Sequence, residues 1–202
     1  MSAGAPDRPF LQAQKREIRA LLRQRLAAMS PQERHAGSLA IADRASATPE
    51  WHKAQTILLY LSLPDEVETR PLLEHALAQG KRLAVPKVIN QKRREMAAVR
   101  AHSLEEADLL AGLYGVRVPR GDDAPIPPGE IDLAIVPGLG FCRRGVRIGR
   151  GLGYYDRYLS RPELRAVLCG LAFTAQVLDE LPADQRDISV QMLVTESEVF
   201  RV

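Results

Sequence analysis

Cysteine, aromatic residues and long apolar runs are all scarce in this chain of 202 residues. Its two cysteines, Cys142 and Cys169, have neither the spacing of a metal-binding pair nor the number needed for a disulfide framework. Such usage is typical of a reducing compartment, so we expect a cytoplasmic protein. No apolar run approaches the roughly 18 residues of a membrane span, and the N-terminus lacks the apolar core of a secretory signal. We therefore expect no contact with a membrane.

Aromatic residues make up 5% of the chain, which argues against a protein that stacks nucleic-acid bases. The formal net charge is +3, and the lysines and arginines are spread along the sequence rather than gathered in one tail. This mild excess suits anionic small molecules and is weak evidence for nucleic acid. We predict small-molecule substrates, no nucleic-acid partner and a monomer. A nucleic-acid-binding module built on the arginines is an alternative, but it would need a basic face rich in aromatic side chains.

Helix and strand signals alternate along the chain in the manner of an α/β protein. Apolar periodicity predicts an amphipathic helix over residues 11–29, and Ser30 with Glu33 forms a capping box that begins a second helix. A further helix over residues 69–79 is expected to end at Gly80. Short apolar segments predict strands at residues 56–61, 81–85, 95–100, 131–136, 166–173 and 190–195. We predict a mixed, largely parallel sheet flanked by helices on both faces.

One domain is expected over residues 11–202, after a flexible N-terminus over residues 1–10. The best candidate for a boundary is residues 120–129, where three prolines and two glycines mark an exposed loop. The strands on either side of this loop are expected to share one sheet, so we predict a single domain. A second capping box, from Ser103 to Glu106, predicts a short helix before the loop.

The most unusual segment lies between Gly138 and Gly153 and holds six of the chain's 14 glycines. Glycine tolerates positive φ and lets backbone N–H groups converge on an anion. Arginines in the same segment provide planar donors for phosphate oxygens. They are Arg143, Arg144, Arg147 and Arg150. Asp156 follows, where a carboxylate is placed to hold Mg²⁺ against bound phosphates. The pattern predicts a phosphate-binding loop, with an arginine-rich surface turn as the alternative.

Two parts of this segment, PGLGF at 137–141 and GVRIGRGLGYYD at 145–156, resemble the signature of the 5-formyltetrahydrofolate cyclo-ligases, also called 5,10-methenyltetrahydrofolate synthetases. Other motifs agree in the expected order, from the pair Lys15 and Arg19, through DEVET at 65–69, to Asp187 before the last strand. The resemblance therefore covers most of the chain. It implies a ligase that uses ATP and Mg²⁺ to cyclise 5-formyltetrahydrofolate to 5,10-methenyltetrahydrofolate, with release of ADP and phosphate.

The same resemblance implies roles for particular residues. The residues that it assigns to ATP are Lys15, Arg19, Arg147, Gly149, Arg150, Gly151, Leu152, Gly153, Tyr154 and Tyr155. Those that it assigns to the folate are Leu61, Glu66 and Tyr154, and those that it assigns to Mg²⁺ are Asp156 and Asp187. The arginines implied to act in catalysis, by holding the transferred phosphoryl group, are Arg147 and Arg150.

Considered without the resemblance, several of these residues have ordinary alternatives. Lys15 and Arg19 share one face of a helix, and charged faces are usually solvated. Glu66 lies in an acid-rich loop, and Asp187 is also an ordinary loop acid. Met96 falls near an apolar folate contact of the family, although a methionine in the hydrophobic core is the favoured interpretation.

The chain also departs from the family pattern. Leu152 stands where lysine is common, and Cys142 stands where aspartate is common. Arg186 and Gln191 occupy positions that more often hold histidine and aspartate. We expect these differences to affect ATP affinity rather than the fold. A paralogue that keeps the nucleotide site but acts on another substrate, or only binds, is the alternative function.

Overall fold

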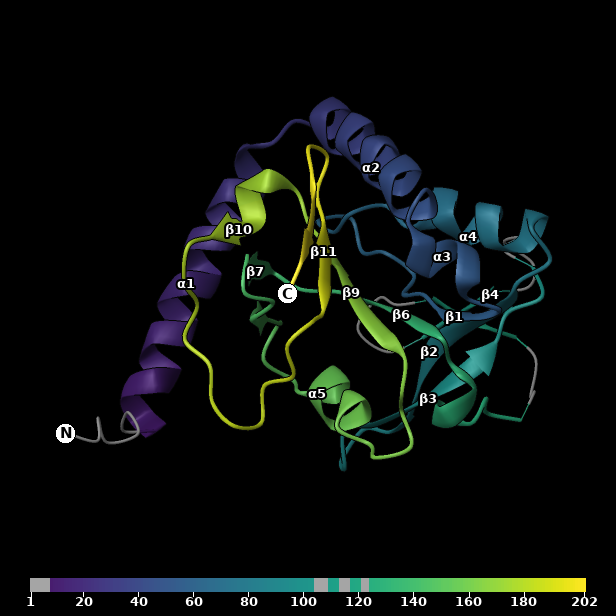
Figure 1. The fold of residues 1–202 in the computed structure, drawn as a ribbon. Coiled ribbons are helices and arrows are strands. Elements are labelled where there is room, and N and C mark those ends of the chain that lie inside the picture. The colour runs from purple at the N-terminus through teal and green to yellow at the C-terminus, as the bar shows by residue number, and fades with distance from the viewer. Residues whose placement is uncertain (1–7, 104–108, 113–116, 121–123) are drawn as a thin grey trace.

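The computed structural model describes residues 8–103, 109–112, 117–120 and 124–202. Its centre is a seven-stranded sheet (Figure 1). In spatial order the strands are β12 (Val199–Arg201), β11 (Met192–Val194), β9 (Val167–Leu171), β6 (Leu133–Val136), β1 (Thr56–Leu58), β2 (Arg82–Asn90) and β3 (Glu95–Arg100). The five strands from β11 to β2 are parallel, and the edge strands β12 and β3 are antiparallel to their neighbours. The predicted mixed, largely parallel sheet is confirmed.

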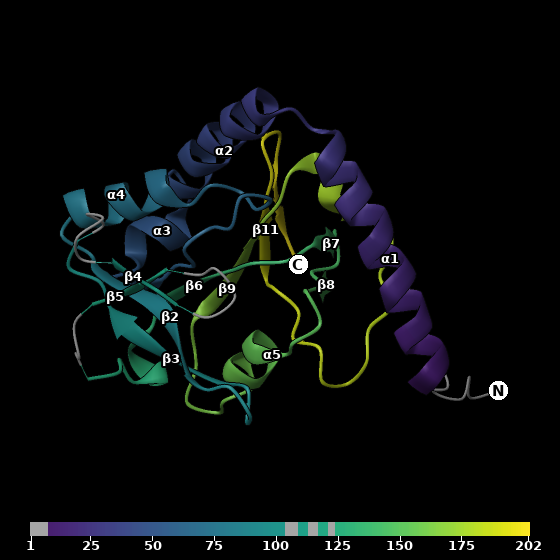
Figure 2. The same ribbon diagram turned by 180° about the vertical axis from the view of Figure 1, so that it is seen from behind.

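Helices cover both faces of this sheet. The α-helices are α1 (Arg8–Ala28), α2 (Pro31–Ser46), α3 (Pro49–Lys53), α4 (Arg70–Ala78) and α5 (Tyr154–Leu159), and the 3₁₀ helices are η3 (Pro128–Glu130) and η4 (Thr174–Gln176). Figures 1 and 2 show α2, α3 and α4 together on one side of the sheet and α5 on the other, with the long α1 along one end. Helices on both faces were expected, and this expectation is also confirmed.

An apolar cluster lies on each face of the sheet, because successive side chains of a strand point to opposite faces. Ile57 of β1 packs in one apolar cluster with Ile41 of α2 and Leu72 of α4. Its neighbour Leu58 packs in a second cluster with Tyr158 of α5. Because both faces of the central strands are buried, their sequences are almost wholly apolar rather than alternating.

Local signals explain where several helices begin and end. At α2 the amide of Glu33 donates to Ser30 Oγ at 3.2 Å and the amide of Ser30 donates to Glu33 Oε2 at 2.7 Å, which is the predicted capping box. After α4, Gly80 has φ +67°, as expected for a helix-ending glycine. The helix predicted to start at residue 11 begins earlier, at Arg8. The short helix predicted from Ser103 lies mostly outside the described residues, as do residues 1–7 of the predicted flexible N-terminus.

Some strand boundaries differ from the prediction. The strand expected over residues 56–61 ends at Leu58, and the one expected to end before Pro86 continues to Asn90. Pro86 is tolerated because β1 pairs with β2 only as far as Ala84, so that no neighbouring strand needs a donor from the proline. A second sheet of three short strands was not predicted. It consists of β10 (Val177–Leu178), β7 (Gly140–Cys142) and β8 (Arg147–Ile148), and a two-stranded pair joins β4 (Leu109–Ala111) to β5 (Arg117–Pro119).

The second sheet divides the glycine-rich segment into two parts with different tasks. A Cβ on Gly140 would lie 2.5 Å from Leu22 Cδ1, and one on Gly145, whose φ is +78°, would lie 2.1 Å from the carbonyl oxygen of Val190. These glycines are therefore required for close packing within the fold. The later glycines, from Gly149 to Gly153, lie in the loop between β8 and α5 instead.

Candidate active site

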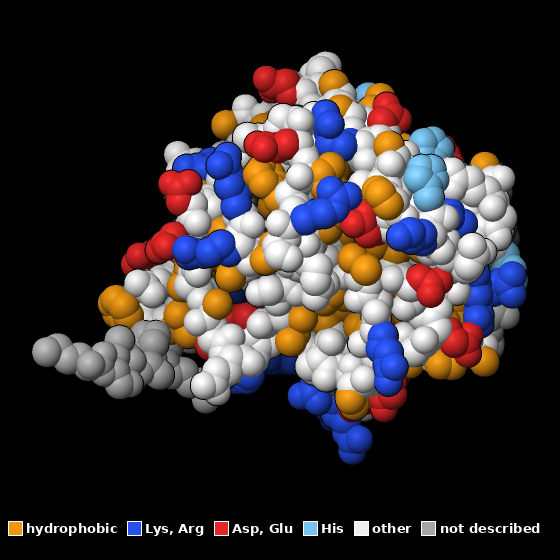
Figure 3. Space-filling view, in the orientation of Figure 1, with side chains coloured by type: hydrophobic (Ala, Val, Ile, Leu, Met, Phe, Trp, Pro, Cys, Tyr) orange, Lys and Arg blue, Asp and Glu red, His pale blue; other side chains and the backbone are white. Residues whose placement is uncertain are grey.

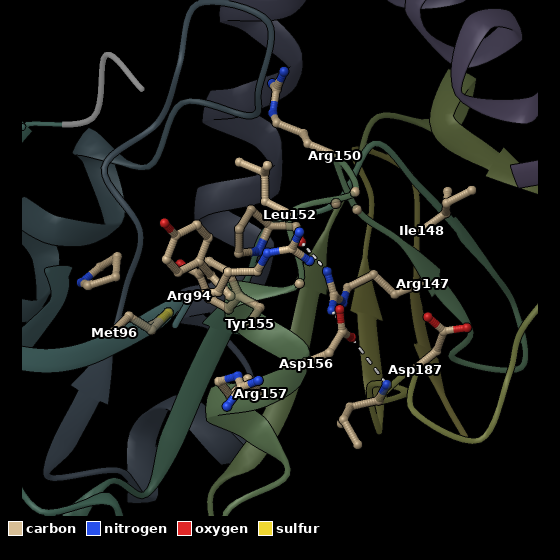
Figure 4. A pocket seen from close by; sticks show the side chains of 18 of the residues that line it. Arg94, Met96, Arg147, Ile148, Arg150, Leu152, Tyr155, Asp156, Arg157 and Asp187 are labelled. Atoms are coloured by element: carbon tan, nitrogen blue, oxygen red, sulfur yellow. Dashed lines mark hydrogen bonds and ion pairs between the residues drawn. The ribbon is translucent and has the colours of Figure 1, made fainter. Parts of the chain in front are cut away.

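A pocket of about 1170 Å³ opens beyond the carboxyl ends of β1 and β6. Ligands of open α/β sheets bind at this edge. Every residue that the sequence assigned to ATP, folate or Mg²⁺ lines the pocket. They come from four separate parts of the chain: α1, the loop after β1, the segment from β8 to α5, and the loop before β11, which carries Asp187. Figure 4 shows how the labelled side chains converge.

Arg147 of β8 is buried in the pocket floor, with 6% of its surface exposed. Its Nη2 donates to Asp156 Oδ1 at 2.5 Å, and its Nη1 donates to the carbonyl oxygen of Pro137 at 3.2 Å. A surface turn would leave this arginine in solvent, so the alternative of an arginine-rich surface turn does not hold for Arg147. By contrast Arg143 and Arg144 are exposed and do not line the pocket.

Two cations of α1 point into the pocket from the other side. Lys15 is 4% exposed, and its Nζ contacts the carboxylate of Asp187 and lies 3.6 Å from Asp184 Oδ2. Arg19 Nε donates to the carbonyl oxygen of Gly149 at 2.8 Å. Burial, followed by the charge of Arg23, lowers the pKa of the Arg19 guanidinium. The solvated-face alternative therefore fails for Lys15, which is buried and paired.

Arg150 connects the glycine loop to the loop after β1. Its Nη2 donates to Asp65 Oδ1 at 2.5 Å and its Nε donates to Glu66 Oε1 at 3.2 Å. Glu66 is held in place because its Oε2 accepts from the amide of Leu63 at 3.0 Å. Burial lowers the pKa of the Arg150 guanidinium, but the two carboxylates outweigh it, so the pKa lies above its usual value. Glu66 thus faces the pocket and is not a solvated loop acid.

Asp156 and Asp187 are the predicted metal ligands, and a hydrogen bond connects the carboxylate of Asp156 to the backbone next to Asp187. Asp156 Oδ1 accepts from the amide of Ile188 at 3.3 Å, and Ile188 directly follows Asp187. Asp187 also accepts from the amide of Asp184 at 2.7 Å. Within the described part of the chain no group of three or more histidines, cysteines or acids is placed to hold a metal ion by itself. Two carboxylates that face one pocket still suit Mg²⁺, which commonly takes one or two carboxylates together with phosphate oxygens and water.

The side of the pocket near β2 and β3 is more apolar. Met96 is 2% exposed, in agreement with a core position, yet it also lines the pocket. The hydroxyl of Tyr155 is buried there without a hydrogen-bond partner among the described residues. Burial and the nearby charge of Glu66 raise the pKa of Tyr155, which keeps the hydroxyl protonated as a donor. An unpaired buried donor of this kind is costly unless a ligand accepts from it.

Sequence reasoning missed some residues of the pocket. Asp184 interacts with Lys15, and Arg94 enters the pocket from the turn between β2 and β3. Neither residue belongs to a recognisable motif, so only the folded chain brings them to the site.

The chain is similar to known proteins over most of its length. A model of the 5-formyltetrahydrofolate cyclo-ligase family matches residues 11–196. The chain is 36% identical over 190 residues to 5-formyltetrahydrofolate cyclo-ligase of Mus musculus, covering 90% of this chain and 93% of the relative. It is 28% identical over 182 residues to the Escherichia coli K12 protein of the same name, covering 89% and 99%. The solved structure of Aquifex aeolicus 5,10-methenyltetrahydrofolate synthetase has a TM-score of 0.80 and 35% identity, covering 93% of this chain and 92% of that one.

Proposed function

The chain belongs to the 5-formyltetrahydrofolate cyclo-ligase family, and we propose that it cyclises 5-formyltetrahydrofolate to 5,10-methenyltetrahydrofolate with ATP, releasing ADP and phosphate. One observation carries the proposal beyond family membership. Every side chain and glycine assigned to ATP, folate or metal from the sequence lines one pocket, although these residues are far apart along the chain. The alternative of a nucleotide-binding paralogue shares the fold but does not require Glu66 in the same pocket.

The reaction explains why such a pocket needs no nucleophilic serine or cysteine. The formamide oxygen of the substrate is a poor leaving group, so it first takes the γ-phosphoryl group of ATP, and ADP departs. N10 then attacks the activated formyl carbon and loses its proton, and the oxygen leaves as phosphate. Phosphoryl transfer asks the protein mainly for positioning and for stabilisation of charge. A pocket lined by arginine, lysine and backbone amides supplies both.

We assign one end of the pocket, the nucleotide half, to the triphosphate. This half consists of Lys15, Arg19, Arg147, Arg150, residues 149–153, Asp156 and Asp187. Arg147 and Arg150 hold the transferred phosphoryl group, and the amides of the glycine loop and the two cations of α1 hold the remaining phosphates. Tyr154 and Tyr155 border both ligands.

Mg²⁺ belongs in the same half. Asp156 and Asp187 would hold it, because their carboxylates supply the hard oxygen donors that this ion prefers. Mg²⁺ bound there would neutralise part of the phosphate charge. Lys15 and Arg147 orient these carboxylates, because each cation contacts one of them.

The other end of the pocket, the folate half, consists of Leu61, Glu66, Pro86, Val88 and Met96. Its apolar wall suits the flat ring system of a reduced folate, and Glu66 is placed to accept hydrogen bonds from ring N–H groups. Tyr154, which directly follows the glycine loop, also lines the pocket. We infer in addition that the protein acts as a monomer in the cytoplasm, which light scattering and fractionation test directly. No helix in the described residues is long and apolar enough to cross a membrane.

The decisive test combines product and phosphate measurements. Purified protein with 5-formyltetrahydrofolate, ATP and Mg²⁺ should generate the near-ultraviolet absorbance of methenyltetrahydrofolate together with an equal amount of phosphate. Omitting either substrate is the control for background hydrolysis. If the folded protein binds an ATP analogue but forms no methenyl product at high protein concentration, the cyclisation is ruled out. The alternative, a paralogue that binds nucleotide but acts on another substrate or only binds, is then the correct interpretation.

A further inference from the structure

The cations of the pocket differ in whether they already have an anionic partner. Lys15, Arg147 and Arg150 each contact a carboxylate. The guanidinium of Arg94 has no hydrogen bond or ion pair with any residue that the structure describes, although it lines the same pocket. An incoming anion can therefore bind the guanidinium of Arg94 without breaking an existing ion pair.

The backbone at Arg94 is also unusual. Its φ of +54° makes it the one non-glycine residue with positive φ in the described ranges, 8–103, 109–112, 117–120 and 124–202. The amide of Arg94 donates to the carbonyl oxygen of Gln91 at 3.2 Å, which closes the turn between β2 and β3. Turns of this kind favour glycine or asparagine at the left-handed position. Costly backbone conformations at bulky residues concentrate where a side chain has a function.

The turn brings this one side chain to the edge of the pocket. In Figure 3 basic side chains project at the lower edge of the molecule, where Figure 1 shows the turn between β2 and β3. Lys92, Arg93 and Arg94 are all exposed, but of these three side chains only Arg94 lines the pocket. Figure 4 shows Arg94 extending toward the segment that carries Leu152 and Arg147.

Leu152 explains why a charge from outside the glycine loop is useful. It lies between Gly151 and Gly153 at the pocket, is 39% exposed, and brings no charge to a loop that otherwise carries arginine toward phosphate. We propose that Arg94 supplies, from the turn between β2 and β3, the positive charge that Leu152 does not, and that it binds the terminal phosphate of ATP where the two halves of the pocket meet. This inference rests on the proposed function, because it takes ATP as the anion.

The sharpest variant is Arg94→Gly, since a structural role and a binding role predict opposite results. Glycine suits positive φ, so the melting temperature should hold or rise. Loss of the guanidinium should raise both the KM for ATP and the Kd of a non-hydrolysable ATP analogue with Mg²⁺ by about five- to tenfold, near the low end for a charged hydrogen bond at a partly exposed site. The KM for 5-formyltetrahydrofolate should change by less than about twofold. Arg94→Asn, which also tolerates this conformation, should behave in the same way.

The matched control is Arg93→Gln, which removes the same charge from the same turn at a residue outside the pocket. It should leave both nucleotide constants close to wild type. In the Arg94→Gly background, Leu152→Lys should restore most of the lost affinity for the analogue, because the new ammonium reaches the same place from the opposite side.

Three results would overturn the inference: an unchanged analogue Kd in Arg94→Gly, an equal loss in Arg93→Gln, or a rise in the folate KM without a rise in the ATP constants. The last result would assign Arg94 to a folate carboxylate. Since the analogue Kd is measured without turnover, it tests Arg94 even if the cyclisation assay fails. A wild-type protein that binds the analogue but makes no product contradicts the proposed function alone.

Discussion

The proposed nucleotide half and the proposed folate half of the pocket differ in how their side chains are partnered before a ligand binds. In the nucleotide half, buried cations are already neutralised: Lys15 contacts Asp187, and Arg147 contacts Asp156. The folate half is a largely apolar wall with one oriented acid, Glu66. Buried charges need partners in the absence of ligand, because isolated charges in a protein interior are strongly destabilising. An apolar surface needs no such partner.

This difference implies different consequences for mutation. Substitutions in the nucleotide half should disturb folding and function together, because each charge also solvates its partner. Substitutions in the folate half should affect one substrate with little effect on stability. Arg150 is the link between them, since it pairs with both Asp65 and Glu66 while belonging to the glycine loop.

The largest expected effect comes from removing the buried arginine of the nucleotide half. Arg147→Gln should lower kcat by about a hundredfold or more, in the range found when one donor to a developing negative charge is lost. Steady-state kinetics with both substrates saturating would measure it. Arg143→Gln, outside the pocket, is the control. Retention of most of kcat by Arg147→Gln would mean that this arginine only supports Asp156.

A smaller loss, shared between activity and stability, is expected for the two carboxylates that we propose as Mg²⁺ ligands. Asp156→Asn and Asp187→Asn should each weaken Mg²⁺-dependent turnover. Each should also lower the free energy of unfolding by about 1–2 kcal/mol, less than the 3–5 kcal/mol for a fully buried pair. The reason is that the side chains of Asp156 and Asp187 are 29% and 21% exposed, whereas the side chains of their partners Arg147 and Lys15 are 3% and 5% exposed. Urea unfolding without Mg²⁺ isolates the stability term.

The control for this pair is Glu180→Gln, which breaks an ion pair with Arg144 whose side chains are 67% and 76% exposed. Exposed pairs contribute little, so its stability should match wild type. If the two aspartate variants were as stable as this control, the pairing of charges in the nucleotide half would not support the fold, and the contrast between the two halves would fail.

Next in size is the effect of the folate acid. Glu66→Gln should raise the KM for 5-formyltetrahydrofolate about tenfold, as expected for loss of one charge-assisted hydrogen bond, and leave the Kd of an ATP analogue nearly unchanged. Asp65→Asn removes the other carboxylate that pairs with Arg150 and serves as the matched variant. If both variants weakened ATP binding equally, the effect would run through Arg150, and the two halves would not be separable.

The residues just discussed also show what sequence could supply. The α/β class, the capping box at Ser30 and the strand at residues 95–100 followed from periodicity and local chemistry, which act over a few residues. The resemblance selected Lys15, Glu66 and Asp187, and the fold brings them to one pocket. The short strands β7, β8 and β10 were missed, because two or three residues carry no periodicity and their pairing is set by distant parts of the chain.

Charge pairing and backbone conformation were beyond the reach of the sequence for a similar reason. Nothing in the local sequence pattern shows that Asp156 accepts a hydrogen bond from Arg147, or that Arg94 adopts positive φ in a turn facing the glycine loop. These features depend on which segments fold against one another. They are also the features on which the proposed mechanism depends most.

The smallest effect is expected at Leu152, the uncharged residue of the glycine loop that lines the pocket. Because this side chain is 39% exposed, a lysine there would keep its ammonium in solvent and need not be forced into the core. Leu152→Lys should therefore lower the KM for ATP with little change in kcat or melting temperature. A charged hydrogen bond alone would allow about tenfold, but the like charge of Arg94 should reduce the gain to about two- to threefold, as repulsion at a partly solvated site is modest. The gain should be larger when Arg94 is replaced by glycine. Steady-state kinetics beside a melting curve would measure each term. An unchanged ATP KM in both backgrounds, with an unchanged melting temperature, would show that position 152 does not face the nucleotide.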